Sequence, residues 1–235
     1  MKILHWYYDL MNLYGDYGNL EVLRKHLEDQ GFEPVVEKKT IHEEVNIESY
    51  DMIYIGSGTE KKQELVREDI LRFRKDLRMY IEEEGILLAT GNAMELFGKT
   101  VDTRECLGFL PFDTGLTKDR YTGDVILHNE EMGDIVGFIN KCSLIAGGEK
   151  EKLFDYVFRD ANLKDNDYEG YEYKNLIGTH VIGPVLVKNP AFMKKIVLLL
   201  GKKNDPDFQY KEIEYPFEED SYQVTHKALL ERRGK

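Results

Sequence analysis

Three short segments of this chain carry residue types that could do chemistry. Residues 9–19 (DLMNLYGDYGN) hold aspartates and glycines, residues 56–63 (GSGTEKKQ) are glycine-rich, and residues 89–98 (ATGNAMELFG) have the pattern of an abrupt strand–turn–helix. The second segment has no G-K-[ST] ending and is no P-loop, but its backbone N–H groups could bind an anion or oxyanion. An elbow like the third lifts a nucleophile onto a helix N-terminus in hydrolases. Singly, each segment also fits ordinary turn chemistry.

Each of the three segments follows a predicted β-strand. In the first hundred residues we expect strands at 2–8, 33–38, 51–56 and 86–90, and helices at 18–30, 61–84 and from 92 to 98. This alternating order predicts an α/β fold with a mostly parallel sheet and right-handed crossovers. Ligands bind such sheets beyond the carboxyl ends of the strands, which is where the three segments would meet.

The second half of the chain is less regular. It predicts strands at 123–128, 134–139, 143–146 and 176–182, loops rich in Asp, Asn and Gly around 160–171, and helices at 190–200 and 219–232. Neither a repeat nor a linker divides the sequence, so we expect one domain over residues 1–235.

Composition limits the function classes. With 32 basic and 44 acidic residues among 235, the net charge is −12, which argues against nucleic-acid and anionic-membrane partners. No apolar run approaches the roughly 20 residues that span a bilayer, and the first residues predict a strand rather than a signal peptide. Cys106 and Cys142 fit neither a disulfide framework nor a zinc pattern. We therefore expect a reduced, cytoplasmic protein without metal or cofactor.

Longer stretches around the three segments carry a family resemblance. DLMNLYGDYGNLEVLRKHLEDQGF is similar to an N-terminal signature, YIGSGTEKKQ to a G-G-G-x-D-R-E-Q loop, and DRYTGDVIL to an R-x-x-G-[DN] segment. Residues 174–190 (KNLIGTHVIGPVLVKNP) resemble N-x-x-G-T-Y-L-H-G-P-x-L-P-K-N. These motifs, spread over residues 5–190, identify the chain as a member of the CobB/CobQ-like class I glutamine amidotransferases. Within them it most resembles the glutaminase subunit of lipid II isoglutaminyl synthase. The resemblance implies a flavodoxin-like three-layer sandwich with helices on both faces of a mostly parallel sheet.

The resemblance also locates a catalytic triad, of which two positions are empty. The family elbow reads A-I-C-G-G-Y-Q-L-L-G, and aligning Glu95 with its glutamine places Gly91 at the nucleophilic cysteine. The family's general-base histidine corresponds to Ile182, whereas the aspartate that orients it is retained as Asp16. Glutaminase chemistry needs a thiolate and a base to activate it, and glycine and isoleucine supply neither.

The surroundings of the triad depart from the family as well. Ser57 and Asn92 replace two family glycines, one in the loop and one just after the nucleophile, and GFINKCS at 137–143 replaces G-F-E-N-H-G-G. Arg120 falls on a family arginine implicated in binding and in communication with a partner ligase, so it could grip a carboxylate or simply pair locally. Besides Arg120, the substrate-binding candidates are Gly56, Gly58 and Asn92.

Four other residues could in principle rescue the chemistry. Cys106 lies in ECLGFLP, away from the elbow, and Cys142 lies near a degenerate strand end, so we interpret both as incidental thiols. His180 would be displaced from Ile182 by roughly 6.5 Å along a strand, too far to act as the base, and is expected to pack in place of the family's tyrosine. Thr90 has no base and is expected in the core.

Two hypotheses remain. The family resemblance taken alone implies an active glutaminase that supplies ammonia to a Mur-ligase-like partner for amidation of the stem-peptide glutamate of lipid II. The empty triad instead favours a pseudo-glutaminase, a module that binds or scaffolds a Mur-ligase-like partner and holds glutamine or another small amino-acid ligand. Losing the nucleophile and base costs on the order of a million-fold in rate, so the second hypothesis is preferred.

Overall fold

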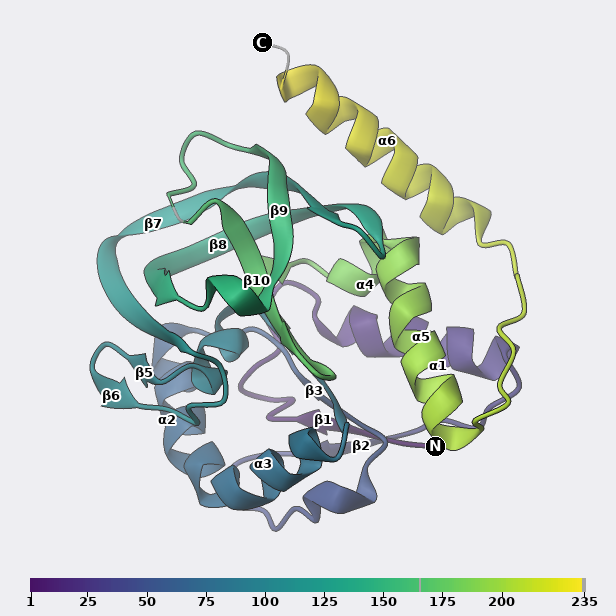
Figure 1. Ribbon diagram of the computed structural model, residues 1–235, viewed down its shortest axis with the longest axis horizontal. Helices are drawn as coiled ribbons and strands as arrows, with labels where there is room; N and C mark the ends of the chain where they lie inside the picture. The colour runs from purple at the N-terminus through teal and green to yellow at the C-terminus, as the bar shows by residue number, and fades with distance from the viewer. Residues whose placement is uncertain (165, 234–235) are drawn as a thin grey trace.

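The computed structural model describes residues 1–164 and 166–233, and it has an α/β architecture built on one twisted sheet (Figure 1). Five of its strands pair in parallel, in the order β2-β1-β3-β4-β11. They are β1 (Lys2–Trp6), β2 (Val35–Lys39), β3 (Met52–Ile55), β4 (Ile86–Thr90) and β11 (Leu176–Thr179). The first four match the predicted strands closely, and β3 and β4 do so because each is a short, fully buried apolar run.

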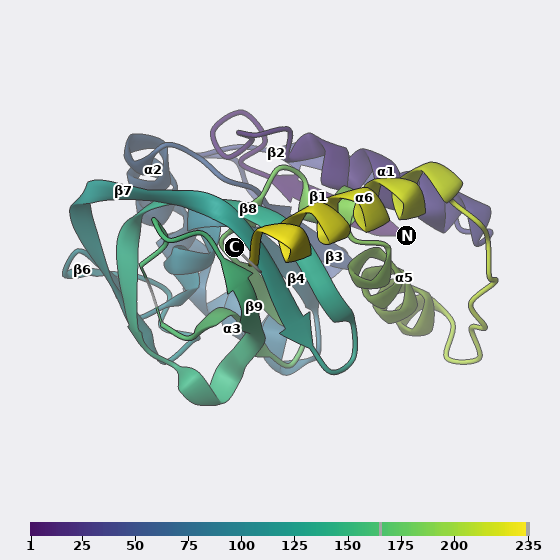
Figure 2. The ribbon, with the colours of Figure 1, turned by 90° about the horizontal axis from the view of Figure 1, so that it is seen from above.

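Helices cover both faces of this parallel part (Figure 2). One face carries α1 (Tyr17–Asp29) and α5 (Pro190–Asn204), with the short α4 (Val185–Lys188) beside them. The other carries α2 (Glu60–Ile70) and α3 (Arg74–Glu82). Neighbouring strand residues feed opposite cores, as with Leu4 and Ile3 on β1, which is the pattern of a parallel sheet buried on both sides. The predicted three-layer arrangement is confirmed.

An antiparallel extension continues the sheet, and the sequence predicted only parts of it. Next to β11 come β10 (Tyr168–Tyr173), β9 (Lys152–Arg159), β7 (Phe112–Asn129), β8 (Gly133–Gly147) and β12 (Val181–Ile182). The small β5 (Thr100–Val101) and β6 (Arg104–Glu105) pair beside β7. Strands β7 and β8 form one long hairpin with an irregularity between Leu116 and Tyr121. The first half of β7 is largely exposed, and its residues 117–120 (TKDR) are polar or charged. This part of the strand therefore has no apolar pattern from which it could be predicted.

Other boundaries also differ from the predictions. The helix expected at 61–84 is interrupted by a 3₁₀ turn at Leu71–Phe73, and the one expected from 92 is a 3₁₀ helix, η3 (Gly91–Phe97). The strand expected at 176–182 divides at His180, because β11 pairs with β4 whereas β12 pairs with β8. The loop expected around 160–171 contains the start of β10. Short 3₁₀ turns also lie at Ile47–Ser49 and Glu149–Glu151.

The C-terminal helix α6 (Pro216–Arg233) lies across the antiparallel hairpin, apart from the layers (Figure 1). Only Leu229 of this helix is buried, in a small cluster with Ile126 and Val136. Residues 205–215, here called the strap, connect α5 to α6 without regular secondary structure. Within the described part of the chain, no helix is both long and apolar enough to cross a membrane.

Candidate functional site

The three polar segments meet at the carboxyl ends of β1, β3 and β4. The backbone N–H of Ser57, after β3, donates to Oδ2 of Asp16, after β1. The next N–H, of Gly58, donates to Oδ1 of Asn92, after β4, over 2.9 Å. The parallel order of the strands thus brings together segments that are far apart in the sequence.

The elbow after β4 has no side chain at its tip. Gly91 has φ +60°, in the left-handed region that favours glycine and that a strained nucleophile elbow also uses. A Cβ built on Gly91 would stand 2.4 Å from Oγ of Ser57 and 3.1 Å from Cγ2 of Ile182. The two positions that the resemblance assigns to the nucleophile and the base therefore lie against each other, and Ser57 fills space that a side chain on Gly91 would need.

The predicted anion-binding role of the glycine-rich loop is not seen in this geometry. Two of its N–H groups, those of Ser57 and Gly58, are already bonded to Asp16 and to the Asn92 side chain. Gly56 packs tightly against Asp16 and the carbonyl of Met11, where a Cβ would lie 2.6 Å from that oxygen. Here the loop satisfies its own donors instead of presenting them to an oxyanion.

Asp16 is fully buried and weakly compensated. Burial raises the pKa of its carboxyl to about 7, and the Ser57 N–H together with the nearby Tyr54 and Thr90 hydroxyls offsets only part of this effect. Its Oδ1 makes no hydrogen bond of normal length with any described residue. The Thr90 hydroxyl is bonded to that of Tyr54 at 3.0 Å, so Thr90 belongs to the core, as its lack of a base suggested.

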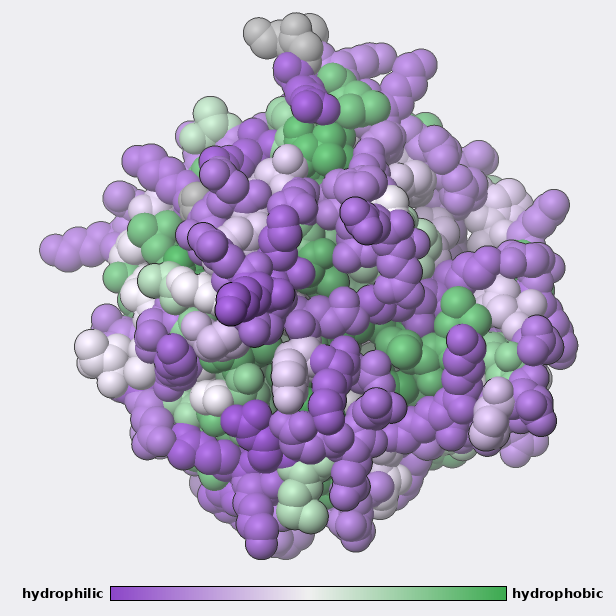
Figure 3. Space-filling view, viewed as in Figure 1, coloured by the Kyte–Doolittle hydropathy of each residue, from purple (hydrophilic) through white to green (hydrophobic). Residues whose placement is uncertain are grey.

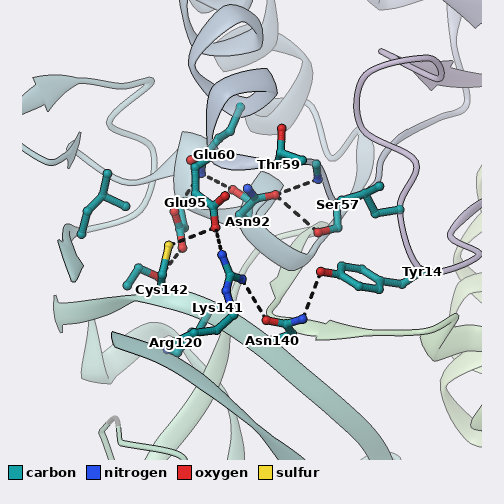
Figure 4. A pocket seen from close by; sticks show the side chains of 15 residues that line it. Tyr14, Ser57, Thr59, Glu60, Asn92, Glu95, Arg120, Asn140, Lys141 and Cys142 are labelled. Carbon is teal, nitrogen blue, oxygen red and sulfur yellow. Dashed lines mark hydrogen bonds and ion pairs between the residues drawn. The ribbon is translucent and has the colours of Figure 1, made fainter. Parts of the chain in front are cut away.

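A polar cavity of about 200 Å³ opens beside the elbow (Figure 4). Its polar lining comes from the loop, the elbow and the β7–β8 hairpin, and it includes Ser57, Glu60, Asn92, Glu95, Arg120, Asn140, Lys141, Cys142 and Ser143. The volume equals about seven waters at roughly 30 Å³ each, which suits a small polar ligand. No group of three or more His, Cys, Asp or Glu able to hold a metal ion occurs among residues 1–164 and 166–233.

A chain of side chains crosses the mouth of this cavity. Arg120 on β7 donates to Oε1 of Glu60 at 2.6 Å and to Oδ1 of Asn140 at 2.9 Å. Asn140 on β8 in turn donates to the Tyr14 hydroxyl at 3.1 Å (Figure 4). Arg120 thus lies at the cavity, where a binding role would need it, but it is engaged by the protein's own Glu60.

Neither cysteine is activated. Cys142 lies inside β8, not at a strand end as we expected, and its thiol lines the cavity and donates to Glu60 at 3.0 Å. Burial and the adjacent Glu60 raise the pKa of this thiol to about 11. Burial raises the pKa of Cys106 to about 11 as well. Because the thiolate is the nucleophile, both are poorly reactive at neutral pH.

A buried charged network, here called the floor, lies behind Glu95, which lines the cavity, and sequence reasoning missed it. The two ring nitrogens of His180 each lie 3.2 Å from a carboxylate oxygen, Nε2 from Glu95 and Nδ1 from Glu169. All three side chains are at most 2% exposed. Since both nitrogens face acceptors, the ring is an imidazolium. Burial and Lys141 lower the pKa of His180, but Glu169 and Glu95 raise it above its ordinary value.

His180 is therefore an ion in a network rather than the neutral packing residue we expected, and it has no free lone pair to act as a base. Ser143 and Gln63 also donate to Glu95, at 2.5 and 2.7 Å. Glu169 lies at the start of β10, in the region expected to be a loop. Because this region was expected to be a loop, the pairing of Glu169 with His180 was not predicted. Glu95 at the family's glutamine position and His180 at its tyrosine position were the signals that could have indicated the network.

Comparison with known proteins decides the family. The model of the CobB/CobQ-like glutamine amidotransferase domain matches residues 2–190. The chain belongs to this family. It is 29% identical to subunit GatD of the glutamine-hydrolyzing lipid II isoglutaminyl synthase of Staphylococcus aureus, over 100% of this chain and 97% of the relative. It is 28% identical to the Streptococcus pneumoniae subunit of the same name, over 89% of this chain and 84% of that relative.

Solved amidotransferase structures share the fold of this family member. A structure described as a glutamine amidotransferase has a TM-score of 0.56 at 15% identity, over 84% of this chain and 98% of that one. A Thermotoga maritima glutamine amidotransferase has a TM-score of 0.51 at 13% identity, over 99% and 97%. The resemblance to GatD-like amidotransferases and the expected fold class are thereby confirmed.

Proposed function

We propose that this GatD-like chain is a pseudo-glutaminase that retains the amidotransferase fold but does not hydrolyse glutamine. The observation that carries the proposal is the packing at the elbow. Gly91 offers no nucleophile, and the Ser57 side chain lies where a cysteine at this position would need room. Ser57 aligns with a family glycine, and Gly91 aligns with the family's nucleophilic cysteine. The Ser57 side chain therefore fills the space beside Gly91, and position 91 has no thiol.

Two further features of the cavity support the same conclusion. The Asn92 amide occupies the Gly58 N–H, a donor that could otherwise stabilise an oxyanion. The nearest histidine, His180, is held as an imidazolium between Glu95 and Glu169, and Ile182 at the family base position has no titratable group. The elbow therefore has neither a thiolate at Gly91 nor a base at Ile182. The Gly58 N–H is also occupied, so it is not free to bind an oxyanion.

What remains is suited to binding. The cavity is polar and small, and it is lined by both acids and bases, which fits glutamine or another small amino-acid ligand. The relatives are named as subunits of lipid II isoglutaminyl synthase, and so we propose a Mur-ligase-like amidating enzyme as the protein partner. In this role the chain would scaffold a cytoplasmic enzyme that uses free ammonia.

An active glutaminase is the alternative. It is favoured by the name of the relatives and by Cys142, the one described thiol in the cavity. Against it, the Cys142 thiol donates to Glu60, and its pKa is raised rather than lowered. A thiol activated for attack needs the opposite shift.

Glutamate release from glutamine by the purified chain tests the proposal. We expect the natural chain to be silent, with Gly91→Cys/Ile182→His gaining little because Ser57 obstructs the new side chain. Adding Ser57→Gly to this pair should clear the space and give measurable turnover. Glutamate release by the natural chain would overturn the proposal, and its loss in Cys142→Ser but not in Cys106→Ser would assign the reaction to the cavity thiol.

A further inference from the structure

A second hollow lies away from the amidotransferase cavity, where the strap passes the N-terminal end of α5 and enters α6. This groove has a volume of about 520 Å³, larger than the 200 Å³ of the cavity at the elbow. Its walls are largely apolar and aromatic, with Pro190 and Ala191 on one side and Tyr210, Ile213, Tyr215 and Pro216 on the other. Figure 3 shows hydrophobic atoms reaching the surface in the region of α5 and the strap.

The walls of the groove are fixed by contacts behind them. Tyr215 donates to Asp29 at 2.9 Å and stacks on the buried ring of His26, with ring centroids 3.8 Å apart. The Gln30 side chain binds both the N–H and the carbonyl of Lys211, at 2.8 Å each, as a neighbouring strand would. A groove whose walls are already ordered binds without the entropy cost of forming them.

The rim of the groove is strongly acidic. Four carboxylates line it, from Glu212, Glu214, Glu219 and Asp220. The lysine in the lining, Lys194, is bonded to Glu212 at 2.5 Å, so that pair is neutral. Glu214 and Asp220 make no ion pair within the described ranges of the chain. The rim thus presents uncompensated negative charge next to apolar walls.

An exposed aromatic residue extends this surface. Phe217, in the first turn of α6, is 90% exposed, and Val224, seven residues later on the same face of the helix, is 71% exposed. Exposed large apolar side chains of this kind are a feature of interaction surfaces. Since Phe217 follows Pro216 of the groove lining, α6 carries exposed apolar side chains next in sequence to the groove.

We propose that this groove binds a basic segment of a partner protein, with an aromatic or aliphatic side chain in the groove and lysines or arginines at Glu214 and Asp220. Charge complementarity selects this occupant, because an acidic or neutral segment would leave the two carboxylates unpaired against apolar walls. The inference is independent of the chemistry at Gly91, and it gives the chain a docking surface away from the cavity.

The test is fluorescence anisotropy with the full chain and three labelled pentapeptides: Lys-Phe-Arg-Leu-Lys, Ser-Phe-Ser-Leu-Ser and Glu-Phe-Glu-Leu-Glu. We expect the basic peptide to bind at least about 10-fold more tightly than the serine peptide, and the acidic peptide not to bind. Glu214→Lys/Asp220→Lys should weaken the basic peptide about 10-fold or more. Ile213→Asp should weaken it too, although it adds negative charge, because the apolar wall is lost.

The matched control is Glu44→Lys/Glu149→Lys, which makes the same change in net charge at two exposed acids outside the groove. This variant should bind the basic peptide like the natural chain. The proposal is overturned if the control weakens binding as much as the groove variant, if Ile213→Asp binds as tightly as the natural chain, or if the basic peptide shows no preference over the serine peptide. Circular dichroism of each variant excludes unfolding as the cause.

Discussion

Two walls beside the amidotransferase cavity, the elbow and the floor behind Glu95, differ in how their buried charges are compensated. At the elbow, Gly91 and Ile182 carry no titratable group, and the Asp16 carboxyl accepts from the Ser57 N–H through Oδ2 while its Oδ1 has no hydrogen-bond partner among the described residues. On the floor, the buried charges are paired and hydrogen-bonded, because His180 lies between Glu95 and Glu169 with further donors around them. The elbow holds one poorly compensated carboxyl, whereas the floor carries a buried ionic network.

This difference shows how hydrogen bonding decides whether a buried carboxyl keeps its charge. Hydrogen bonds and ion pairs lower the pKa values of Glu95 and Glu169 in spite of burial, but burial prevails at Asp16 and raises its pKa. The carboxylates of the floor therefore stay ionised without a ligand. At the elbow, burial disfavours the ionised form of the Asp16 carboxyl.

The largest expected effect is on the floor. His180→Leu leaves two buried carboxylates without their cation, and breaking a buried pair in this way costs about 3–5 kcal/mol of unfolding free energy. Urea denaturation at pH 7 measures the loss. The surface pair Arg24–Glu28 provides the contrast, since Arg24→Ala should cost only about 0.3–0.5 kcal/mol. A loss below about 1 kcal/mol for His180→Leu would mean that the floor is not ionic.

The next effect concerns the elbow and depends on pH. The Asp16 carboxyl ionises near pH 4 when the chain is unfolded, but burial moves its pKa to about 7 when it is folded. Between these values the folded state binds the extra proton, so this carboxyl lowers stability as the pH rises. Asp16→Asn cannot ionise and should become more stable than the natural chain as pH increases, by up to about 4 kcal/mol at pH 8.

Urea denaturation of both proteins at pH 5, 6, 7 and 8 follows this difference. The relative gain begins near pH 4, so within this series it should keep rising from pH 5 to 7 and level off by pH 8. A constant difference across the series would show that the Asp16 carboxyl titrates normally, and the contrast between the two walls would then fail.

The family, the parallel strands and the two aligned positions Gly91 and Ile182 could be reached from the sequence because each rests on local patterns or aligned motifs. The antiparallel half could not, since β7 carries TKDR on an exposed face and β10 begins among loop-forming residues. The network at His180 was missed for the same reason, because Glu169 reaches it only through β10. The occupied N–H of Gly58 depends on how Asn92 is oriented, which no sequence pattern specifies.

The smallest effect tests whether Ser57 really fills the space at Gly91. Gly91→Ala adds a methyl group 2.4 Å from the Ser57 Oγ, on a backbone with positive φ. The φ strain of about 1–2 kcal/mol persists in any background, but the contact with Ser57 disappears in Ser57→Gly. A double-mutant cycle on unfolding free energies should therefore give a coupling of about 1–3 kcal/mol.

Gly133→Ala is the matched control for this cycle. Gly133 also has positive φ, but a Cβ there would meet no atom within 4 Å, so its cost should be independent of Ser57. If Gly91→Ala likewise shows no coupling to Ser57→Gly, then Ser57 does not obstruct the elbow. In that case the cysteine and histidine variant should release glutamate equally well with and without Ser57→Gly. The stability cycle and the glutaminase assay thus examine one packing contact by two independent measurements.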